Sequence, residues 1–365
     1  MKKKTKTISK KTGTSSIVAN ILESIKKEFK DDNIVSTASD MTEYSLEGIK
    51  RIPTGDPQLD VDLGGGIPIG RVIHISGEYS STKSTQSLHM LRNAQQMGLP
   101  CALMDFENTL DNAYLQQLGI DTDDMVYSNP SSLEEVAQLM QSLQEKGIKF
   151  IIWDSVAVAE PTKVLESDTG DSVQMGVKQK LIGEFLGKFQ SINNRFTRNG
   201  EMPCTLILIN QVREKIGAYG DPEYEPGGRA VGFYTSVHIR FRKGDWITEG
   251  TGNNKEIVGQ VVKYKIVKNK TYKRMVSGEF DFYQVDSEIA GVKEGYNDTF
   301  KSAIMLALSY NLVTRGGAWF YIDKGLDTEK KFQGLEKLIE YFRANPELID
   351  KYKEQILEIE RRAKE

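Results

Sequence analysis

The chain alternates short, mostly apolar runs with longer segments in which apolar residues recur at helical spacing. The apolar runs cover 72–76, 101–104, 149–153 and 204–209, and helical spacing marks 84–97, 112–118, 131–145 and 177–198. Short apolar strands separated by helices are typical of a parallel sheet that is covered on both faces. The pattern therefore predicts an α/β fold with a mostly parallel sheet flanked by helices.

The pattern changes beyond residue 233. Segments 233–243, 256–270 and 277–285 alternate or run in β-branched residues, which predicts antiparallel strands that extend the same sheet. From about 286 the chain is mostly helical, with a helix at 299–310, a short strand at 318–322 and two further helices. We predict a core at 47–286 and a small α+β C-terminal domain at 287–365.

Residues 1–46 form the third predicted part, a basic tail followed by a helical arm. The first eleven residues hold six lysines and no acid, which is typical of a solvated tail or of one that contacts nucleic acid. Residues 15–29 are amphipathic at helical spacing. Their apolar face must pack on its own domain or on a neighbouring subunit as an oligomerisation arm. Glycine and proline at 52–70 predict a structured loop that leads into the first core strand.

Composition places the protein among soluble globular proteins. Of 365 residues, 39% are hydrophobic and 27% charged, and no apolar stretch is long enough to span a membrane. No secretion signal follows the lysine-rich start, so a cytoplasmic location is expected. The net charge of −3 means that nucleic acid would need a local basic surface. Cys101 and Cys204 lie in apolar runs and are expected to be buried core side chains.

The segment at 71–85, RVIHISGEYSSTKST, is an apolar strand that runs into a turn ending in Lys83 and Ser84. It nearly matches the phosphate-loop pattern G-x-x-x-x-G-K-[S/T], in which backbone amides, a lysine and a hydroxyl hold phosphates and magnesium. An ordinary strand, loop and helix with a surface lysine is the alternative. The predicted nucleotide-binding residues of this loop are Gly77, Glu78, Tyr79, Ser80, Ser81, Thr82, Lys83, Ser84 and Thr85.

Thr82 stands where the pattern expects its second glycine. A β-branched residue tolerates a positive φ badly, so we expect backbone strain if the loop needs that conformation.

Two acids at strand ends complete the predicted site. Asp154 closes the apolar run at 149–153, where an acid lies beside the phosphate loop and can hold magnesium together with Ser84. A cap on the next turn is the alternative role for Asp154. Glu107, two residues past the strand at 101–105, is placed to orient or deprotonate an attacking water, although a surface glutamate would show the same pattern.

The sequence around these residues resembles the bacterial RecA recombinase family. The resemblance runs from about 52 to 270, through the blocks at 52–85, DFENTLDNAYLQQLGID, IIWDSVAV, GDSVQMG, 206–240 and IVKNK, in the family's order and approximate spacing. It implies a RecA-like ATPase core that uses ATP and Mg²⁺. Glu107 falls on the family's catalytic glutamate, Tyr114 on its adenine-stacking tyrosine and Asp111 on an adenine-contacting acid. Gln211 matches the glutamine that senses the γ-phosphate.

The same resemblance implies an assembly. Lys268 and Lys270 match the lysines that reach across a filament interface to the neighbour's ATP, where two cations would neutralise charge on the γ-phosphate. Without the resemblance, these lysines would be interpreted as a solvated strand end.

Two segments fall where the family has its DNA-binding loops, 166–180 and 213–229. In the first, Met175 is placed to wedge between bases and Lys180 to contact phosphate. The second is glycine-rich and without an apolar pattern, as expected of a loop that orders on a ligand. The predicted DNA-binding residues are Met175, Gly176, Lys180, Arg213, Lys215, Gly227, Gly228 and Arg229.

The chain also departs from the family. Besides Thr82, Gly232 replaces an interface lysine, and the second loop is about one residue shorter, so that Tyr219 only approximately matches the family's aromatic residue. The tail at 350–365 mixes both charge signs, whereas the family's tail is acidic. These departures indicate a divergent member with altered ATP turnover and weaker self-inhibition, and a phage or plasmid origin is one interpretation.

The resemblance implies an ATP-dependent recombination and repair protein. It would form a filament on single-stranded DNA and exchange strands with a homologous duplex, and ATP would favour the tightly bound state. Two alternatives stay open: another RecA-fold ATPase, helicase-like or regulatory, and a single-strand-binding filament protein that has lost hydrolysis.

Overall fold

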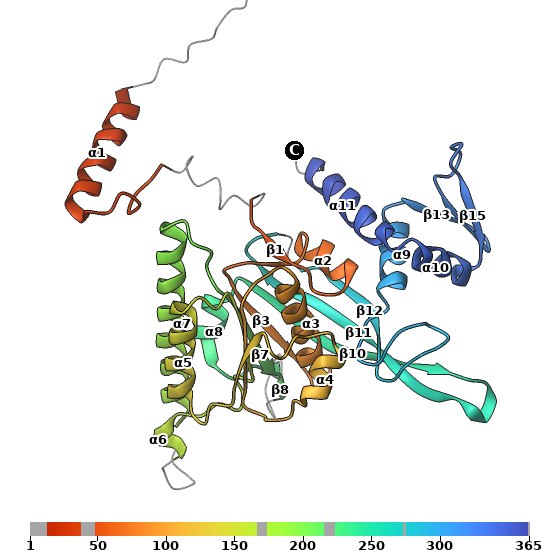
Figure 1. Ribbon diagram of the computed structural model, residues 1–365, viewed down its shortest axis with the longest axis horizontal. Helices are drawn as coiled ribbons and strands as arrows, with labels where there is room; N and C mark the ends of the chain where they lie inside the picture. The colour runs from red at the N-terminus through yellow and green to blue at the C-terminus, as the bar shows by residue number, and fades with distance from the viewer. Residues whose placement is uncertain (1–12, 38–47, 166–173, 215–222, 273–274, 364–365) are drawn as a thin grey trace, which may run out of the picture.

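A computed structural model describes residues 13–37, 48–165, 174–214, 223–272 and 275–363, and its centre is an eight-stranded sheet (Figure 1). In spatial order the strands are β12 (Ser277–Tyr283), β11 (Glu256–Asn269), β10 (Val237–Glu249), β3 (Val72–Gly77), β7 (Thr205–Gln211), β6 (Phe150–Asp154), β4 (Cys101–Asp105) and β5 (Met125–Ser128). The strands from β10 to β5 are parallel to one another, and β11 and β12 are antiparallel to their neighbours. The predicted α/β fold with an antiparallel extension is confirmed.

Helices cover both faces of the parallel strands, as Figure 1 shows. Helices α5 (Leu133–Glu145) and α7 (Gln174–Arg198) pack on one face, and α3 (Lys83–Gln96) and α4 (Asn112–Gln117) lie on the other. Successive residues of one strand therefore enter different cores: Leu206 and Leu208 pack with α7, whereas Ile207 and Ile209 pack with α3. This double burial explains why the central strands are mostly apolar.

The segment that we predicted as a structured loop at 52–70 contains a helix, α2 (Pro57–Leu63), between the short strands β1 (Arg51–Ile52) and β2 (Ile67–Pro68). Its signals are local. Asp56 accepts a hydrogen bond from the amide of Leu59 at 2.9 Å, Pro57 occupies the first turn, and Gly64 ends the helix at φ 90°. Because glycine and proline are frequent in this segment, we predicted a loop and did not predict this helix of two turns.

The chain after 286 begins with α9 (Thr299–Ser309), and ends in α10 (Leu335–Ala344) and α11 (Glu347–Arg362). We predicted one strand here. The structure has a three-stranded antiparallel sheet, β13 (Val313–Gly316), β14 (Trp319–Ile322) and β15 (Lys330–Gln333). The outer strands are mostly exposed, with Val313 the one fully buried residue of β13 and Phe332 the one apolar residue of β15, so that hydrophobic patterning did not reveal them. Ile304, Leu338 and Phe342 are fully buried between these elements. The domain boundary at 286/287 remains a prediction.

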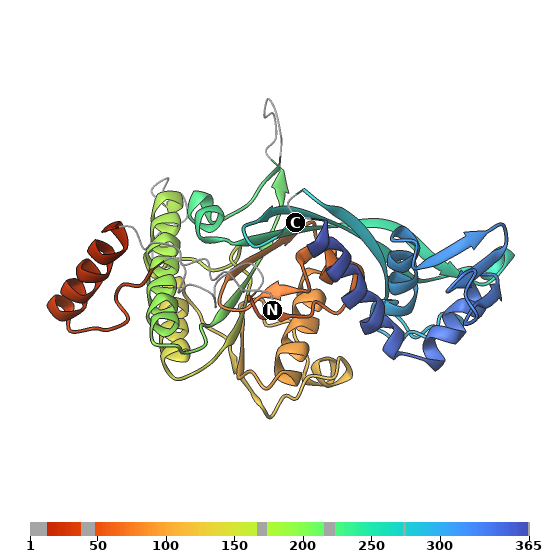
Figure 2. The same ribbon diagram turned by 90° about the horizontal axis from the view of Figure 1, so that it is seen from above.

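Helix α1 (Gly13–Phe29) stands apart from the sheet in both views (Figures 1 and 2). Its apolar residues stay exposed, with Ile17 at 59%, Ile21 at 51% and Phe29 at 60%. An ion pair of 3.4 Å between Asp31 and Arg198 joins the following turn to the end of α7. The described part of the chain therefore leaves the apolar face of α1 uncovered. No helix in the described ranges is long and apolar enough to cross a membrane.

Candidate nucleotide and DNA site

The phosphate-loop segment lies between the end of β3 and the start of α3, at the carboxyl edge of the parallel strands. A Cβ on Gly77 would lie 2.3 Å from the carbonyl oxygen of Phe241 on the adjacent strand β10, so this position requires glycine. The hydroxyl of Ser81 and the ammonium of Lys83 both donate to the carbonyl of Glu78, at 2.8 and 2.6 Å. These contacts fold the loop tightly over the first turn of α3.

Lys83 is buried at 8% exposure, and its ammonium is directed into the loop. Burial lowers the pKa of Lys83, and the carboxylates of Asp154, Glu107 and Glu78 partly oppose this shift. A desolvated lysine beside a helix N-terminus attracts a polyanion strongly, since little water competes for its charge.

Ser84 and Asp154 are in direct contact, because the hydroxyl of Ser84 donates to Oδ2 of Asp154 at 2.6 Å. Burial raises the pKa of Asp154 to about 6, and the charges of Glu107 and Asp105 add to the effect. A hydroxyl and a buried carboxylate form the oxygen donor set that magnesium prefers, and a cation there would relieve the repulsion between the carboxylates. The residues present thus fit the metal that the sequence predicts.

Glu107 lies on a turn fixed by Asp105, whose Oδ1 accepts hydrogen bonds from the backbone amides of Glu107 and Asn108 at 3.0 and 2.9 Å. Its own Oε1 accepts from Ser155 Oγ at 3.1 Å and from Gln211 Nε2 at 3.2 Å. The sequence analysis missed Asp105 and Ser155. Both stand at the ends of adjacent parallel strands, the one signal that could have found them.

Thr82 has φ 64° and ψ 14°, the left-handed conformation that is unfavourable for a threonine. Its side chain does not cap α3, and its hydroxyl is buried without a hydrogen-bond partner in the described chain. The condition under which we predicted strain, a positive φ at Thr82, is confirmed. The loop nevertheless keeps Lys83 and Ser84 at the start of the helix.

Replacing Thr82 with glycine is expected to raise the free energy of unfolding by about 1 kcal/mol, because glycine adopts this φ without steric cost and removes an unsatisfied hydroxyl. Urea denaturation measures the change. Thr197→Gly in α7 is the matched control, and it should destabilise by about 1 kcal/mol as glycine does in a helix. An equal decrease in the free energy of unfolding in both variants would show that Thr82 is unstrained.

The two residues predicted to contact adenine lie beside this loop. Asp111 caps α4 by accepting from the amide of Ala113 at 3.3 Å. The hydroxyl of Tyr114 lies 3.1 Å from Thr85 Oγ1, on the first turn of α3, and burial raises its pKa. Tyr79, in contrast, is 85% exposed. Contacts of Asp111 and Tyr114 with a base remain predictions.

Lys268 and Lys270 lie at the end of β11 and contact α8 (Gly228–Tyr234). Lys268 Nζ donates to the carbonyl of Gly232 at 2.7 Å and Lys270 Nζ to that of Phe233 at 3.5 Å. Burial and the charge of Lys270 lower the pKa of Lys268. Both cations therefore sit on the carboxyl end of a short helix. A Cβ on Gly232 would meet no atom, so the glycine here is not a steric requirement.

The described residues of the two predicted DNA segments include regular structure. Residues 174–180 belong to α7, so that Gly176 and Lys180 lie on a helix, and Lys180 forms an ion pair of 3.8 Å with Glu184. The side chain of Met175 and residues 166–173 lie outside the described residues. The helix that we predicted at 177–198 therefore begins three residues earlier, at Gln174, before the apolar spacing starts.

The second segment contains the paired strands β8 (Arg213–Glu214) and β9 (Glu223–Tyr224), and α8 begins at its end. Gly227 and Gly228 have φ 93° and 68°, so glycine is needed at the start of α8. Arg213 and Arg229 are exposed, whereas Lys215 and Tyr219 lie outside the described residues. The strands join residues nine or more positions apart, which no local pattern encodes.

A parallel sheet, a loop with an inward-facing lysine at the start of a helix, and a hydroxyl paired with an acid define a nucleotide-binding phosphate-loop protein. The sequence model of the RecA N-terminal domain matches residues 16–287. The chain is 34% identical to Protein RecA of Cutibacterium acnes over 93% of this chain and 90% of that protein. It is 35% identical to Protein RecA of Citrifermentans bemidjiense, covering 91% of each chain. The chain belongs to the RecA family.

Proposed function

We propose that the protein uses ATP and Mg²⁺ to assemble on single-stranded DNA and to pair it with a homologous duplex. By its family the protein is a DNA-dependent ATPase of recombination and repair. One observation carries the proposal for this chain: Gln211 donates to Glu107 at 3.2 Å and stands two residues before Arg213, where the second DNA segment begins. The candidate catalytic glutamate is thus in contact with a side chain that lies directly before the DNA segment.

The residues present assign roles for hydrolysis. Lys83 and the loop amides would hold the terminal phosphates, and Ser84 with Asp154 would hold magnesium, which supplies positive charge against the phosphate oxygens. Glu107 would accept a proton from the attacking water, in an orientation fixed by Asp105 and Ser155.

The proposed partners are DNA and further copies of the chain, in a helical filament in the cytoplasm. The uncovered apolar face of α1 supports docking on a neighbouring copy, because exposed Ile17, Ile21 and Phe29 gain from burial. The head-to-tail contact that this implies would also bring Lys268 and Lys270 to a neighbour's nucleotide.

Two measurements test the proposal. The first is ATP hydrolysis with and without single-stranded DNA, and the second is strand exchange between a single strand and either a homologous or an unrelated duplex. We expect DNA to stimulate hydrolysis and only homologous partners to pair. Hydrolysis with unwinding but no homologous pairing would support a helicase-like ATPase. Tight DNA binding with neither activity would support an inert filament protein.

A further inference from the structure

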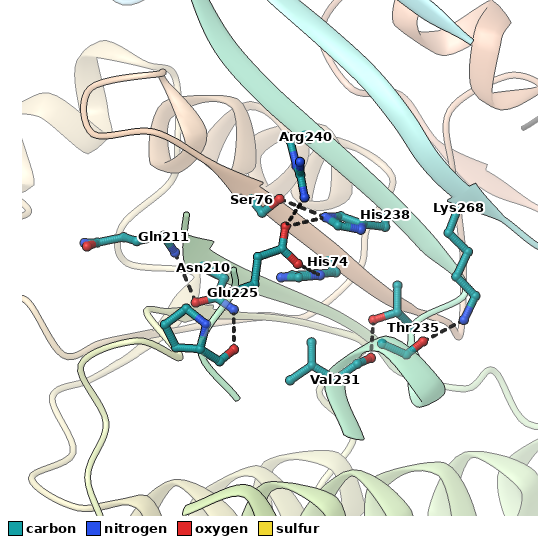
Figure 3. Close-up of polar contacts among 12 residues, drawn as sticks. His74, Ser76, Asn210, Gln211, Glu225, Val231, Thr235, His238, Arg240 and Lys268 are labelled. Carbon is teal, nitrogen blue, oxygen red and sulfur yellow. Dashed lines mark hydrogen bonds and ion pairs between the residues drawn. The ribbon is translucent and has the colours of Figure 1, made fainter. Parts of the chain in front are cut away.

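A half-buried carboxylate, Glu225, lies between two histidines and an arginine at the root of the second DNA segment (Figure 3). Its Oε1 is 3.0 Å from Arg240 Nη2 and 3.3 Å from His238 Nε2, and its Oε2 is 3.7 Å from His74 Nδ1. His74 and His238 are direct neighbours across β3 and β10. Ser76 Oγ, one residue before Gly77, lies 2.8 Å from His238 Nε2.

The charges in this cluster favour an ionised Glu225. Burial alone would raise its pKa, but the hydrogen bond and charge of His238, with contributions from His74 and Ser76, hold the pKa of Glu225 well below its usual range. Burial lowers the pKa of His74 to about 3, so that this imidazole is neutral at physiological pH. The closest contacts of the carboxylate are therefore with Arg240 at 3.0 Å and His238 at 3.3 Å.

A metal ion is a weaker explanation of the same residues. Ligand atoms of His74, Glu225 and His238 lie within 4.8 Å of one another, as in a metal site. The two imidazole rings, however, stack at 4.2 Å with an interplanar angle of 21°, so their in-plane lone pairs cannot meet at one ion. The guanidinium of Arg240 on the same carboxylate also repels a cation.

A second contact holds the neighbouring residue. Asn210 Nδ2 donates to the carbonyl of Pro226 at 2.7 Å, and Asn210 Oδ1 accepts from the amide of Gln211 at 3.0 Å. In the sheet, Gly77 of the phosphate loop pairs with Gln211 on one side and Phe241 on the other. The root of the DNA segment is therefore fixed to β3, which leads into the phosphate loop, and to the two strands that flank it, β7 and β10.

We propose that Glu225 is a positioning residue for DNA binding, a clamp that fixes the carboxyl root of the second DNA segment to the phosphate-loop strand. The clamp holds Glu225 and Pro226 in place before DNA binds, so that binding does not have to order these two residues, which lowers its entropic cost. It also ties the direction of the segment to β3, so that nucleotide at Gly77 and Lys83 acts on DNA affinity through a fixed connection. This inference rests on the proposed function.

The dissociation constant for a labelled oligo-dT, measured with and without a non-hydrolysable ATP analogue, tests the clamp. We expect Glu225→Gln to reduce the gain in affinity that the analogue produces by about tenfold, within the usual range of coupling between sites. Glu225→Asp keeps the carboxylate and should retain part of the gain. Asp281→Asn is the matched control, because Asp281 lies on the edge strand β12 and this change breaks its partly buried ion pair with Lys301 of α9.

Arg240→Gln completes a double-mutant cycle. If Arg240 acts through Glu225, the double variant should lose no more than either single variant. Additive losses, or a Glu225→Gln variant that unfolds more easily but keeps the full gain, would overturn the clamp. A stoichiometric transition metal retained by the wild type and lost in Glu225→Gln would also overturn it. If the wild type itself binds DNA without any gain from the analogue, the proposed function fails instead.

Discussion

Replacing Lys83 with alanine is expected to reduce DNA-stimulated ATP hydrolysis to background, a loss of at least about 10³-fold. The lysine is the cation that the loop directs inward, and alanine offers neither charge nor hydrogen bond to a phosphate. The fold should survive, because the side chain makes one hydrogen bond to the carbonyl of Glu78, worth about 1 kcal/mol. Phosphate release measures turnover, and thermal unfolding checks the fold.

Lys146→Ala is the matched control for this variant, since Lys146 is an exposed lysine at the end of α5, far along the chain from the loop. It should keep wild-type turnover. Turnover by Lys83→Ala equal to that of the control would remove the phosphate-loop assignment, and with it the roles proposed for Ser84 and Asp154.

The sheet was predictable because its central strands are buried on both faces and therefore appear in the sequence as apolar runs. The elements that sequence patterns missed are half-exposed or short. β5 has an exposed Val126 and Tyr127, and β15 is mostly lysine and glutamine, so neither shows the apolar run of a buried strand. Helix α8 begins at two glycines with positive φ, a composition typical of loops.

The residues of the site likewise fall into those that a local sequence pattern predicts and those that it does not. Lys83 and Ser84 follow from a local motif, and Asp154 from its place at a strand end. The contacts that organise these residues join distant parts of the chain: Ser155 to Glu107 across 48 positions and Gln211 to Glu107 across 104. Such pairs depend on strand order and register, which a single sequence does not display. The neighbouring histidines of β3 and β10 are 164 positions apart for the same reason.

Lys268 and Lys270 illustrate why a single chain is an incomplete description of the proposed active site. Within one chain the lysines donate to carbonyls of α8 and contact no residue of the phosphate loop in the described chain. Charge on a transferring phosphoryl group is stabilised strongly by cations supplied in trans, by about 10³-fold or more. If a neighbouring copy supplies these lysines, hydrolysis depends on assembly, and the need for DNA follows because DNA organises the filament.

Replacing both Lys268 and Lys270 with alanine is expected to lower DNA-stimulated hydrolysis about 10³-fold, by analogy with cations supplied in trans. Glu107→Gln should also be inactive while still holding nucleotide through Lys83 and Ser84. Mixed in equal amounts, the two variants should recover about a quarter of the wild-type rate, because a head-to-tail filament then combines an intact Glu107 with a neighbour's intact lysines at that fraction of interfaces. Phosphate release from the mixture, with DNA binding of each variant as the assembly check, makes the measurement.

Lys255→Ala, an exposed lysine in the connection between β10 and β11, is the matched control and should hydrolyse ATP normally. A mixture that stays inactive although both variants bind DNA would place the lysines outside the neighbour's active site. Full activity of the double variant alone would mean that the charge of the γ-phosphate is neutralised within one chain. Recovery in the mixture requires that the lysines act on the nucleotide of a neighbouring copy. Neither variant carries a complete site, and only the interface between the two variants can supply one.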